Sequence, residues 1–172
     1  MLAADELIES FGARTRQWVW NTNQLGRGEL PPNLVALTNA QWRGRVVIAL
    51  PLFGSTATHF QVLRQRWGGA RWRTWCRALL TNGVMTVDGN STVVQLVGRG
   101  EVALGLTDSD DVRAGIRNGL PIAGMPLGVD GLAIRNTLGH IRGAPRPGLA
   151  KRLARFLQSP PVRSALVEVG AI

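Results

Sequence analysis

Short apolar runs alternate along the chain with longer stretches whose apolar residues recur at helical spacing. The short runs, which are rich in Val, Ile, Leu or Trp, predict strands at residues 16–21, 45–50, 84–87 and 102–107. The longer stretches predict helices at residues 3–11, 55–67, 70–81, 90–98, 109–118, 148–158 and 161–169. Strands that alternate with helices are typical of an α/β fold with a mostly parallel or mixed sheet.

Glycine and proline residues at the ends of the predicted elements support this assignment of helices and strands. Gly12 is expected to close the first helix, and Pro51 ends the near-continuous apolar run 45–50, which predicts a strand buried on both faces. Residues 121–126 and 129–134 contain only short apolar segments, to which the pattern assigns no element.

Length and composition narrow the class of protein. A chain of 172 residues suits one domain of ordinary size, with room for a small second lobe. Its 45% apolar and 18% charged residues are typical of a folded globular chain and exclude a long disordered tail as its main feature. No run approaches the roughly 20 consecutive apolar residues of a bilayer span.

The net charge of +9 comes from 20 basic and 11 acidic residues, and Lys151 is the single lysine. Positive charge favours small anionic ligands through electrostatic steering and also suits nucleic acids. The basic residues are dispersed, however, and no helix-turn-helix, RNP or zinc-finger pattern accompanies them. Nucleic acid is therefore not an expected partner.

Two further features restrict the interpretation. The first twelve residues are acidic and amphipathic, which does not fit a secretory signal peptide, so we expect a cytoplasmic protein or a piece of a longer chain. Cys76 is the only cysteine and lies in a predicted helix, so it forms no internal disulfide and is interpreted as an inert core residue.

Candidate ligand-binding residues gather at three junctions, where a predicted strand is followed by a predicted helix. In an open α/β sheet, ligands bind beyond the carboxyl ends of the strands, and helix N-termini attract anions. The residues at these junctions are Gly54, Ser55 and Thr56, then Asn90 and Ser91, and then Asp108, Asp110 and Asp111.

Each junction also has a purely structural interpretation. Ser55, Asn90 and Ser109 suit the N-cap position of a helix, and acidic residues are common in a first turn. The three aspartates nevertheless concentrate more negative charge than a cap requires, which leaves a cation, an amine or a polar ligand open. For His59, one turn beyond Ser55, a packing or surface role is favoured over ligand binding.

The sequence does not indicate an enzyme. It contains no GxSxG, GxxxxGK[ST] or HExxH motif, and the glycines of GRGEVALG precede a predicted strand, which is the wrong order for a phosphate loop.

An ordered series of segments resembles a known family. The segments are NTNQL, LTNAQWRGRVVIALPLFGSTATHF, NGVMTVDGNSTVVQLVGRGEVALGLTDSDD, GAPRP and RLARFLQSPPVRSAL. Over residues 13–170 they resemble the substrate-binding proteins of bacterial ABC importers, and above all the ferric-iron-binding branch. The resemblance implies a type 2 periplasmic-binding fold, in which two α/β lobes joined by crossing strands close on a ligand.

The chain covers only part of that fold. The resemblance implies that residues 1–21 end lobe 1 and form the first hinge strand, that 22–105 form a complete lobe 2, and that 106–172 contain the second crossing and the C-terminal part of lobe 1. The opening half of lobe 1 has no counterpart, so the chain is expected to be a fragment. In such a fragment Trp18 and Trp20 are expected to be partly exposed, and dimerisation is an open possibility.

The resemblance also assigns roles to residues. Gly54, Ser55 and Thr56 match the loop that holds the anion accompanying the metal, and Asn90 and Asp108 match polar residues of the cleft.

Asp110 and Asp111 stand where iron-binding relatives carry two tyrosines that ligate ferric iron, whereas this chain contains no tyrosine. These carboxylates would bind a hard cation, an amine or a sugar hydroxyl. Ferric iron with an accompanying anion is therefore a candidate cargo and not an assigned one.

The resemblance implies a solute-binding component of an ABC importer that captures a small anionic or metal–anion ligand without catalysis. Its partner would be the importer's membrane permease, and its location periplasmic or at the cell surface. Two alternatives remain open, namely a ligand-sensing regulatory domain of the same architecture and a truncated, nonfunctional fragment.

Overall fold

The computed structural model describes residues 8–171 and divides the chain into two compact units. The larger unit is Thr15–Leu132, and the smaller unit combines Ala133–Ile172 with the segment that precedes Thr15. The expected lobes divided the chain at other points, after residues 21 and 105. Residues 106–132 belong by their contacts to the larger unit, because the strands that they contribute pair within its sheet.

The larger unit contains most of the regular structure. Its strands are β1 (Ile8–Asn21, which begins in the smaller unit), β2 (Val46–Ala49), β3 (Met85–Val87), β4 (Leu104–Asp108) and β5 (Ile122–Pro126). Its helices are α1 (Gly54–Trp67), α2 (Gly69–Thr81), α3 (Asn90–Gly98) and α4 (Ser109–Arg117), with short 3-10 turns η2 (Arg27–Glu29), η3 (Val35–Thr38), η4 (Ala40–Trp42) and η5 (Gly128–Asp130).

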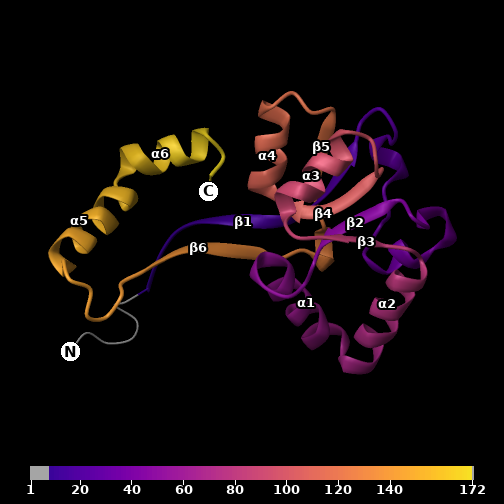
Figure 1. Ribbon diagram of the computed structural model, residues 1–172, viewed down its shortest axis with the longest axis horizontal. Coiled ribbons are helices and arrows are strands. Elements are labelled where there is room, and N and C mark those ends of the chain that lie inside the picture. Colours follow the sequence, from indigo (N-terminus) through magenta and orange to yellow (C-terminus); the bar gives the residue numbers. More distant parts are fainter. Residues whose placement is uncertain (1–7, 172) are drawn as a thin grey trace. The chain divides into compact units, whose positions relative to one another are not determined.

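The sheet is mixed, with strand order β3-β2-β4-β1-β5 (Figure 1). The strands β3, β2 and β4 run parallel, whereas β1 runs antiparallel to both of its neighbours, β4 and β5. The prediction of an α/β fold with a mixed sheet flanked by helices is therefore confirmed.

Two hydrophobic clusters cover the two faces of this sheet, because successive side chains of a strand point to opposite faces. Trp18, Val46, Ile48 and Leu104 face a cluster that includes residues of α1 and α2. Val19, Val47 and Ala49 face a second cluster built with residues of α3 and α4. The larger unit is thus a three-layer α/β/α structure.

In the smaller unit, β6 (Ala133–Gly139) pairs with β1 and is followed by α5 (Pro147–Gln158) and α6 (Pro160–Glu168). Among the described residues, no helix of the chain is long and apolar enough to cross a membrane.

The helix expected at residues 3–11 is wrong from Ile8 onward, where β1 begins, and residues 3–7 lie outside the described part of the chain. Ile8 and Phe11 are spaced as in an amphipathic helix, but the pairing of β1 with β6 outweighs this local pattern. The strands β5 and β6 were also not predicted.

The expected partial exposure of Trp18 and Trp20 is wrong as well. Their side chains are 2% and 6% exposed. Both residues lie where β1 is paired on both sides, and both point into the cluster beneath α1 and α2.

His59 and Asp130 connect α1 to η5 and to the start of η3. The imidazole Nε2 lies 2.7 Å from the backbone oxygen of Asp130, whose carboxylate accepts a hydrogen bond from the backbone N–H of Leu34 at 2.9 Å. His59 is fully buried. Burial lowers its pKa to about 4, the hydrogen bond to Asp130 opposes this shift, and the nearby Arg16 cation adds to it.

A first prediction concerns the close approach of α3 to the sheet. A Cβ atom at Gly105 would lie 2.5 Å from Cγ1 of Val93 and 3.1 Å from Cγ1 of Val19, both in the core. We expect Gly105→Ala to lower stability by about 1–3 kcal/mol through overpacking, and Tm by roughly 3–10 °C in a thermal melt. Gly28→Ala, where an added Cβ meets nothing within 4 Å, is the control and should leave Tm nearly unchanged.

A second prediction concerns pH. Because the pKa of His59 is lower in the folded state than in the unfolded chain, the unfolded state binds the additional proton between pH 6.5 and 4. The contribution of His59 is fully present above pH 6.5 and is lost as the pH falls toward 4, by about 3 kcal/mol between pH 7 and 4. Urea unfolding of the wild type and His59→Gln across this range measures it. An equally steep pH dependence in both proteins would contradict the assignment.

Candidate functional site

The three predicted junctions lie at one edge of the sheet. The strands β3, β2 and β4 are adjacent and parallel, and each is followed directly by a helix, so the starts of α3, α1 and α4 share the carboxyl edge. This is the edge at which open α/β sheets bind ligands.

These three helices begin without side-chain caps. Their N-cap residues are Phe53, Gly89 and Asp108, none of which forms a side-chain cap hydrogen bond. The interpretation of Ser55, Asn90 and Ser109 as N-caps is therefore wrong, because these residues already lie in the first helical turn. At α1 the chain enters the helix through Gly54 with φ of +65°, a conformation that suits glycine because it lacks a Cβ.

Arg16 is the residue at this edge that the sequence reasoning missed. Antiparallel pairing of β1 with β4 places Arg16 directly opposite Asp108. Nη1 of Arg16 lies 2.8 Å from Oδ1 of Asp108, and the two side chains are 0% and 2% exposed. The available signal was that Arg16 begins one apolar run and Asp108 follows another, which an antiparallel pair of those runs brings together.

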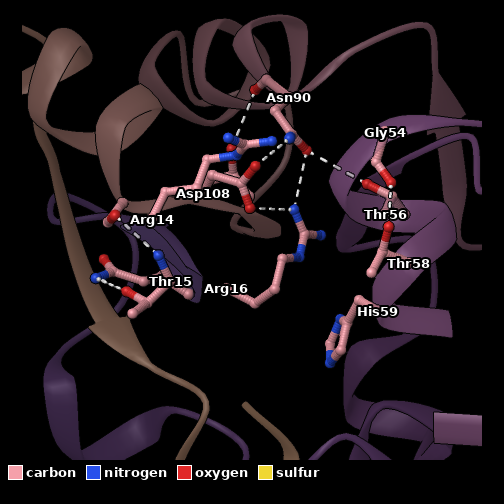
Figure 2. Close-up of polar contacts among 12 residues, drawn as sticks. Arg14, Thr15, Arg16, Gly54, Thr56, Thr58, His59, Asn90 and Asp108 are labelled. Atoms are coloured by element: carbon pink, nitrogen blue, oxygen red, sulfur yellow. Dashed lines mark hydrogen bonds and ion pairs between the residues drawn. The ribbon is translucent and has the colours of Figure 1, made fainter. Parts of the chain in front are cut away.

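Asn90 and Thr56 extend this ion pair into a network (Figure 2). Nη1 of Arg16 also donates to Oδ1 of Asn90 at 3.2 Å, and Nδ2 of Asn90 donates to Oδ2 of Asp108 at 3.0 Å. The hydroxyl of Thr56 donates to Oδ1 of Asn90 at 3.5 Å. We call Arg16, Asp108, Asn90 and Thr56 the Arg16 network; it links β1, β4, α3 and α1.

The Arg16 guanidinium is only partly satisfied. Within the described residues, its Nε and Nη2 atoms are buried and have no hydrogen-bond partner, so all its hydrogen bonds involve Nη1. A guanidinium carries five N–H donors, and an unpaired buried donor costs free energy. These donors therefore require an oxygen acceptor, which a water or a bound oxyanion would supply.

Acidic residues lie beside this network. Asp108, Asp110 and Asp111 each offer a carboxylate oxygen, and the three atoms lie within 4.8 Å of one another. Asp110 and Asp111 are half-buried in the first turn of α4, where the helix dipole favours negative charge. Oδ1 of Asp110 is buried and has no hydrogen-bond partner among the described residues. Both oxygens of Asp108, in contrast, already bond to Arg16 and Asn90.

The remaining predicted residues are placed differently. Ser55 is buried next to Thr56 in the first turn of α1. Ser91 is exposed on α3 and forms no described hydrogen bond to the Arg16 network. His59 is a buried packing residue bonded to Asp130, in line with the role favoured from the sequence.

Comparison with known proteins identifies the family to which this sequence is similar. The family model of the bacterial extracellular solute-binding proteins matches residues 15–171. No curated protein matches the sequence.

Solved structures share the fold at low sequence identity. Iron-bound HitA from Pseudomonas aeruginosa matches with a TM-score of 0.86 and 20% identity, over 96% of this chain and 55% of that chain. The periplasmic binding protein AfuA from Actinobacillus pleuropneumoniae, solved with exogenous fructose-6-phosphate, gives 0.78 and 22%, over 95% and 52%. A two-component system protein that mediates signal transduction gives 0.75 and 17%, over 98% and 56%.

The chain thus spans about half the length of these solved relatives. The prediction of a type 2 periplasmic-binding-like fold that covers only part of the two-lobed architecture is confirmed. Because the family model matches nearly its whole length, the chain belongs to the bacterial extracellular solute-binding proteins.

Proposed function

We propose that this chain is the ligand-capturing part of an ABC importer's solute-binding protein and that it binds a small oxyanion-bearing solute at the Arg16 network. The observation that carries the proposal is the buried Arg16 guanidinium, whose Nε and Nη2 donors have no partner among the described residues. A guanidinium presents its donors in a planar fork, which suits the oxygens of a carboxylate or a phosphate.

The start of α1 supports the same ligand chemistry. Gly54, Ser55 and Thr56 form its first turn at the carboxyl edge of the sheet, and the N-cap residue Phe53 forms no side-chain cap hydrogen bond there. Helix N-termini of this kind bind anions through their backbone N–H groups and the helix dipole. The hydroxyl of Thr56 adds a donor or acceptor that already lies within the Arg16 network.

Asp110 and Asp111 give the site a second, acidic part. Two carboxylates suit a hard cation that arrives with the anion, or the hydroxyl or amine groups of an organic anion. The absence of tyrosine and the Arg16 cation beside Asp108 both weigh against ferric iron as in an iron-bound relative. A phosphorylated solute with hydroxyl groups, the class of ligand seen in AfuA, uses both parts of the site.

In the whole protein, capture would involve closure of a second lobe over the ligand. A hinge closure of this kind is stabilised by a ligand that contacts both lobes only in the closed state. The chain would then deliver the solute to the importer's permease at the periplasmic or outer face of the membrane, without catalysis. Because this chain is about half as long as its solved relatives, we expect it to bind weakly on its own.

A ligand-sensing role is the second candidate, because the two-component signalling protein shares the fold. In that role the solute would be recognised by the same residues, and the output would pass to a signalling partner instead of a permease. Uptake of a labelled ligand is measured in cells that lack the protein, before and after the protein is supplied again. This comparison distinguishes the two roles, because a sensor would not restore uptake directly.

A third prediction tests the oxyanion site. Inorganic phosphate, citrate and fructose 6-phosphate are titrated by calorimetry and by thermal shift, where a ligand at 100 times its Kd adds about 2.7 kcal/mol, or roughly 5–10 °C in Tm. In the bound state the Thr56 hydroxyl would turn from Asn90 to donate to the oxyanion, so Thr56→Val should weaken the Kd by roughly 10–100-fold through loss of one hydrogen bond to a charged group. The matched control is Thr74→Val on α2, whose hydroxyl donates to the Ala70 carbonyl within its own helix. Equal Kd values in both variants would exclude the site.

A fourth prediction separates the acidic part from the oxyanion site. The double variant Asp110→Asn/Asp111→Asn should abolish any Tm shift caused by calcium or by ferric citrate beyond that of citrate alone. Phosphate binding should persist or tighten by a few-fold, since two nearby negative charges are removed. The control is Glu29→Gln/Glu101→Gln, which removes the same charge at exposed positions of the same unit. Loss of phosphate binding in the first variant alone would show that the aspartates hold the anion indirectly.

A further inference from the structure

A pocket of about 330 Å³ lies between α2 and the edge strand β3 of the larger unit. Its walls include Phe60 of α1, Trp72 and Cys76 of α2, Ile48 of β2 and Thr86 of β3. The lining is almost entirely aliphatic or aromatic. Small-molecule sites span roughly 300–1,000 Å³, so this volume suits a short alkyl chain or a single ring system. We call it the α2–β3 pocket.

The walls of the α2–β3 pocket are built by the larger unit itself. Every lining residue lies in that unit, and Phe60 and Leu79 belong to its buried cluster beneath α1 and α2. Ile48 and Thr86 are direct partners in the parallel pairing of β2 with β3. The strands β2 and β4 separate β3 from β1, the strand that continues into the smaller unit. No residue of the Arg16 network lines the pocket, so this inference does not depend on the proposed function.

Basic side chains border the pocket. The guanidinium of Arg64 lies over the ring of Trp72, with 5.8 Å between its carbon and the ring centroid. Arg73 and Arg77 each precede a lining residue of α2 by three positions, which makes them its neighbours on the helix surface. All three arginines are exposed, and none forms an ion pair within the part of the chain that the structure describes.

No acidic residue of this part of the sequence balances these charges. Residues 30–87, which include every lining residue, contain seven arginines and neither aspartate nor glutamate. The electrostatic potential at the mouth of the pocket is therefore expected to be positive, which attracts anions and repels cations. An apolar interior with a positive border suits a ligand that is apolar at one end and negatively charged at the other.

We propose that the α2–β3 pocket binds a small amphiphilic anion, with an alkyl or aryl body and a carboxylate or phosphate at one end. The body would lie against Phe60 and Trp72, where removal of its apolar surface from water stabilises the complex. The anionic end would lie at the border of the pocket, where Arg64, Arg73 and Arg77 supply charge-assisted hydrogen bonds.

A second copy of the chain fits the pocket less well. Two copies that paired along their β3 strands would bring the same arginines together, in a chain of net charge +9. The strand β3 has only three residues (Met85–Val87), so its free edge offers few backbone hydrogen bonds to a partner strand.

Cys76 provides a direct measure of occupancy, because it is the only cysteine of the chain and it lines the pocket. Its thiol is half-buried, and burial raises the pKa of Cys76. We expect saturating decanoate to slow the alkylation of Cys76 by iodoacetamide at alkaline pH by about fivefold or more, and acetate to leave the rate unchanged. In calorimetry the Kd of decanoate should be about tenfold lower than that of decanol, which has the same chain without the charge.

Paired variants separate a local from a global effect of charge. Arg64→Gln/Arg73→Gln should weaken decanoate binding about tenfold and leave decanol binding unchanged. Arg27→Gln/Arg117→Gln removes the same charge at exposed positions of η2 and α4, and should weaken decanoate binding less than about threefold. Equal losses in the two double variants would overturn the proposal, since the net charge of the chain would then account for binding.

A second pair of variants tests the position of the ligand. Successive side chains of β3 point to opposite faces, and Thr86 lines the pocket whereas Met85 does not. Thr86→Phe should fill the pocket and abolish decanoate binding, and Met85→Phe should leave the Kd unchanged. Decanoate binding that survives Thr86→Phe would place the ligand elsewhere and overturn the proposal. Thermal melts of each variant check that the larger unit remains folded.

Three other outcomes also overturn the proposal. Unchanged alkylation of Cys76 at saturating decanoate would mean that the pocket takes no such ligand. Equal Kd values for decanoate and decanol would show an apolar pocket that does not recognise the charge. A particle of twice the 18.6 kDa chain mass in light scattering, with Cys76 protected before any ligand is added, would mean that a second copy covers the pocket.

Discussion

The buried ion pair between Arg16 and Asp108 is the constraint on which the candidate site depends. Taking both charges out of water costs several kcal/mol per ion, and that cost is offset only if the pair keeps good geometry and further hydrogen bonds. The antiparallel register of β1 and β4 supplies the geometry, and Asn90 supplies the hydrogen bonds. Removal of either partner would leave an uncompensated charge in the sheet, so the strand order and the site are linked energetically.

Elements that depend on local sequence pattern could be predicted, whereas elements that depend on pairing with a distant strand could not. The run 45–50 identifies a buried strand because β2 is covered on both faces, and the helices after Pro51, Gly68 and Gly89 begin close to the predicted residues. Residues 8–11 were predicted as a helix because their apolar spacing is helical, and only pairing with β6, more than a hundred residues away, makes them a strand. Local pattern cannot report such a distant partner.

The same distinction separates the site residues. Gly54, Thr56, Asn90 and Asp108 were predicted because each lies at a strand-to-helix junction, a feature of local sequence. Arg16 lies at no junction and becomes part of the site only through its register with Asp108. Trp18 and Trp20 were misjudged for the same reason, since their burial depends on β4 and β5 pairing on either side of β1.

The N–H donors of Arg16 that have no partner among the described residues suit the proposed binding of a ligand. A guanidinium that used all its N–H groups within the protein would stabilise the sheet further but would leave none for a ligand. With Nη1 fixed by Asp108 and Asn90, the orientation of Nε and Nη2 is set before a ligand arrives, which lowers the entropic cost of binding. An oxyanion that accepted from these donors, as proposed, would remove their desolvation penalty. Its binding would then be favoured by the same burial that leaves these donors without a partner in the described structure.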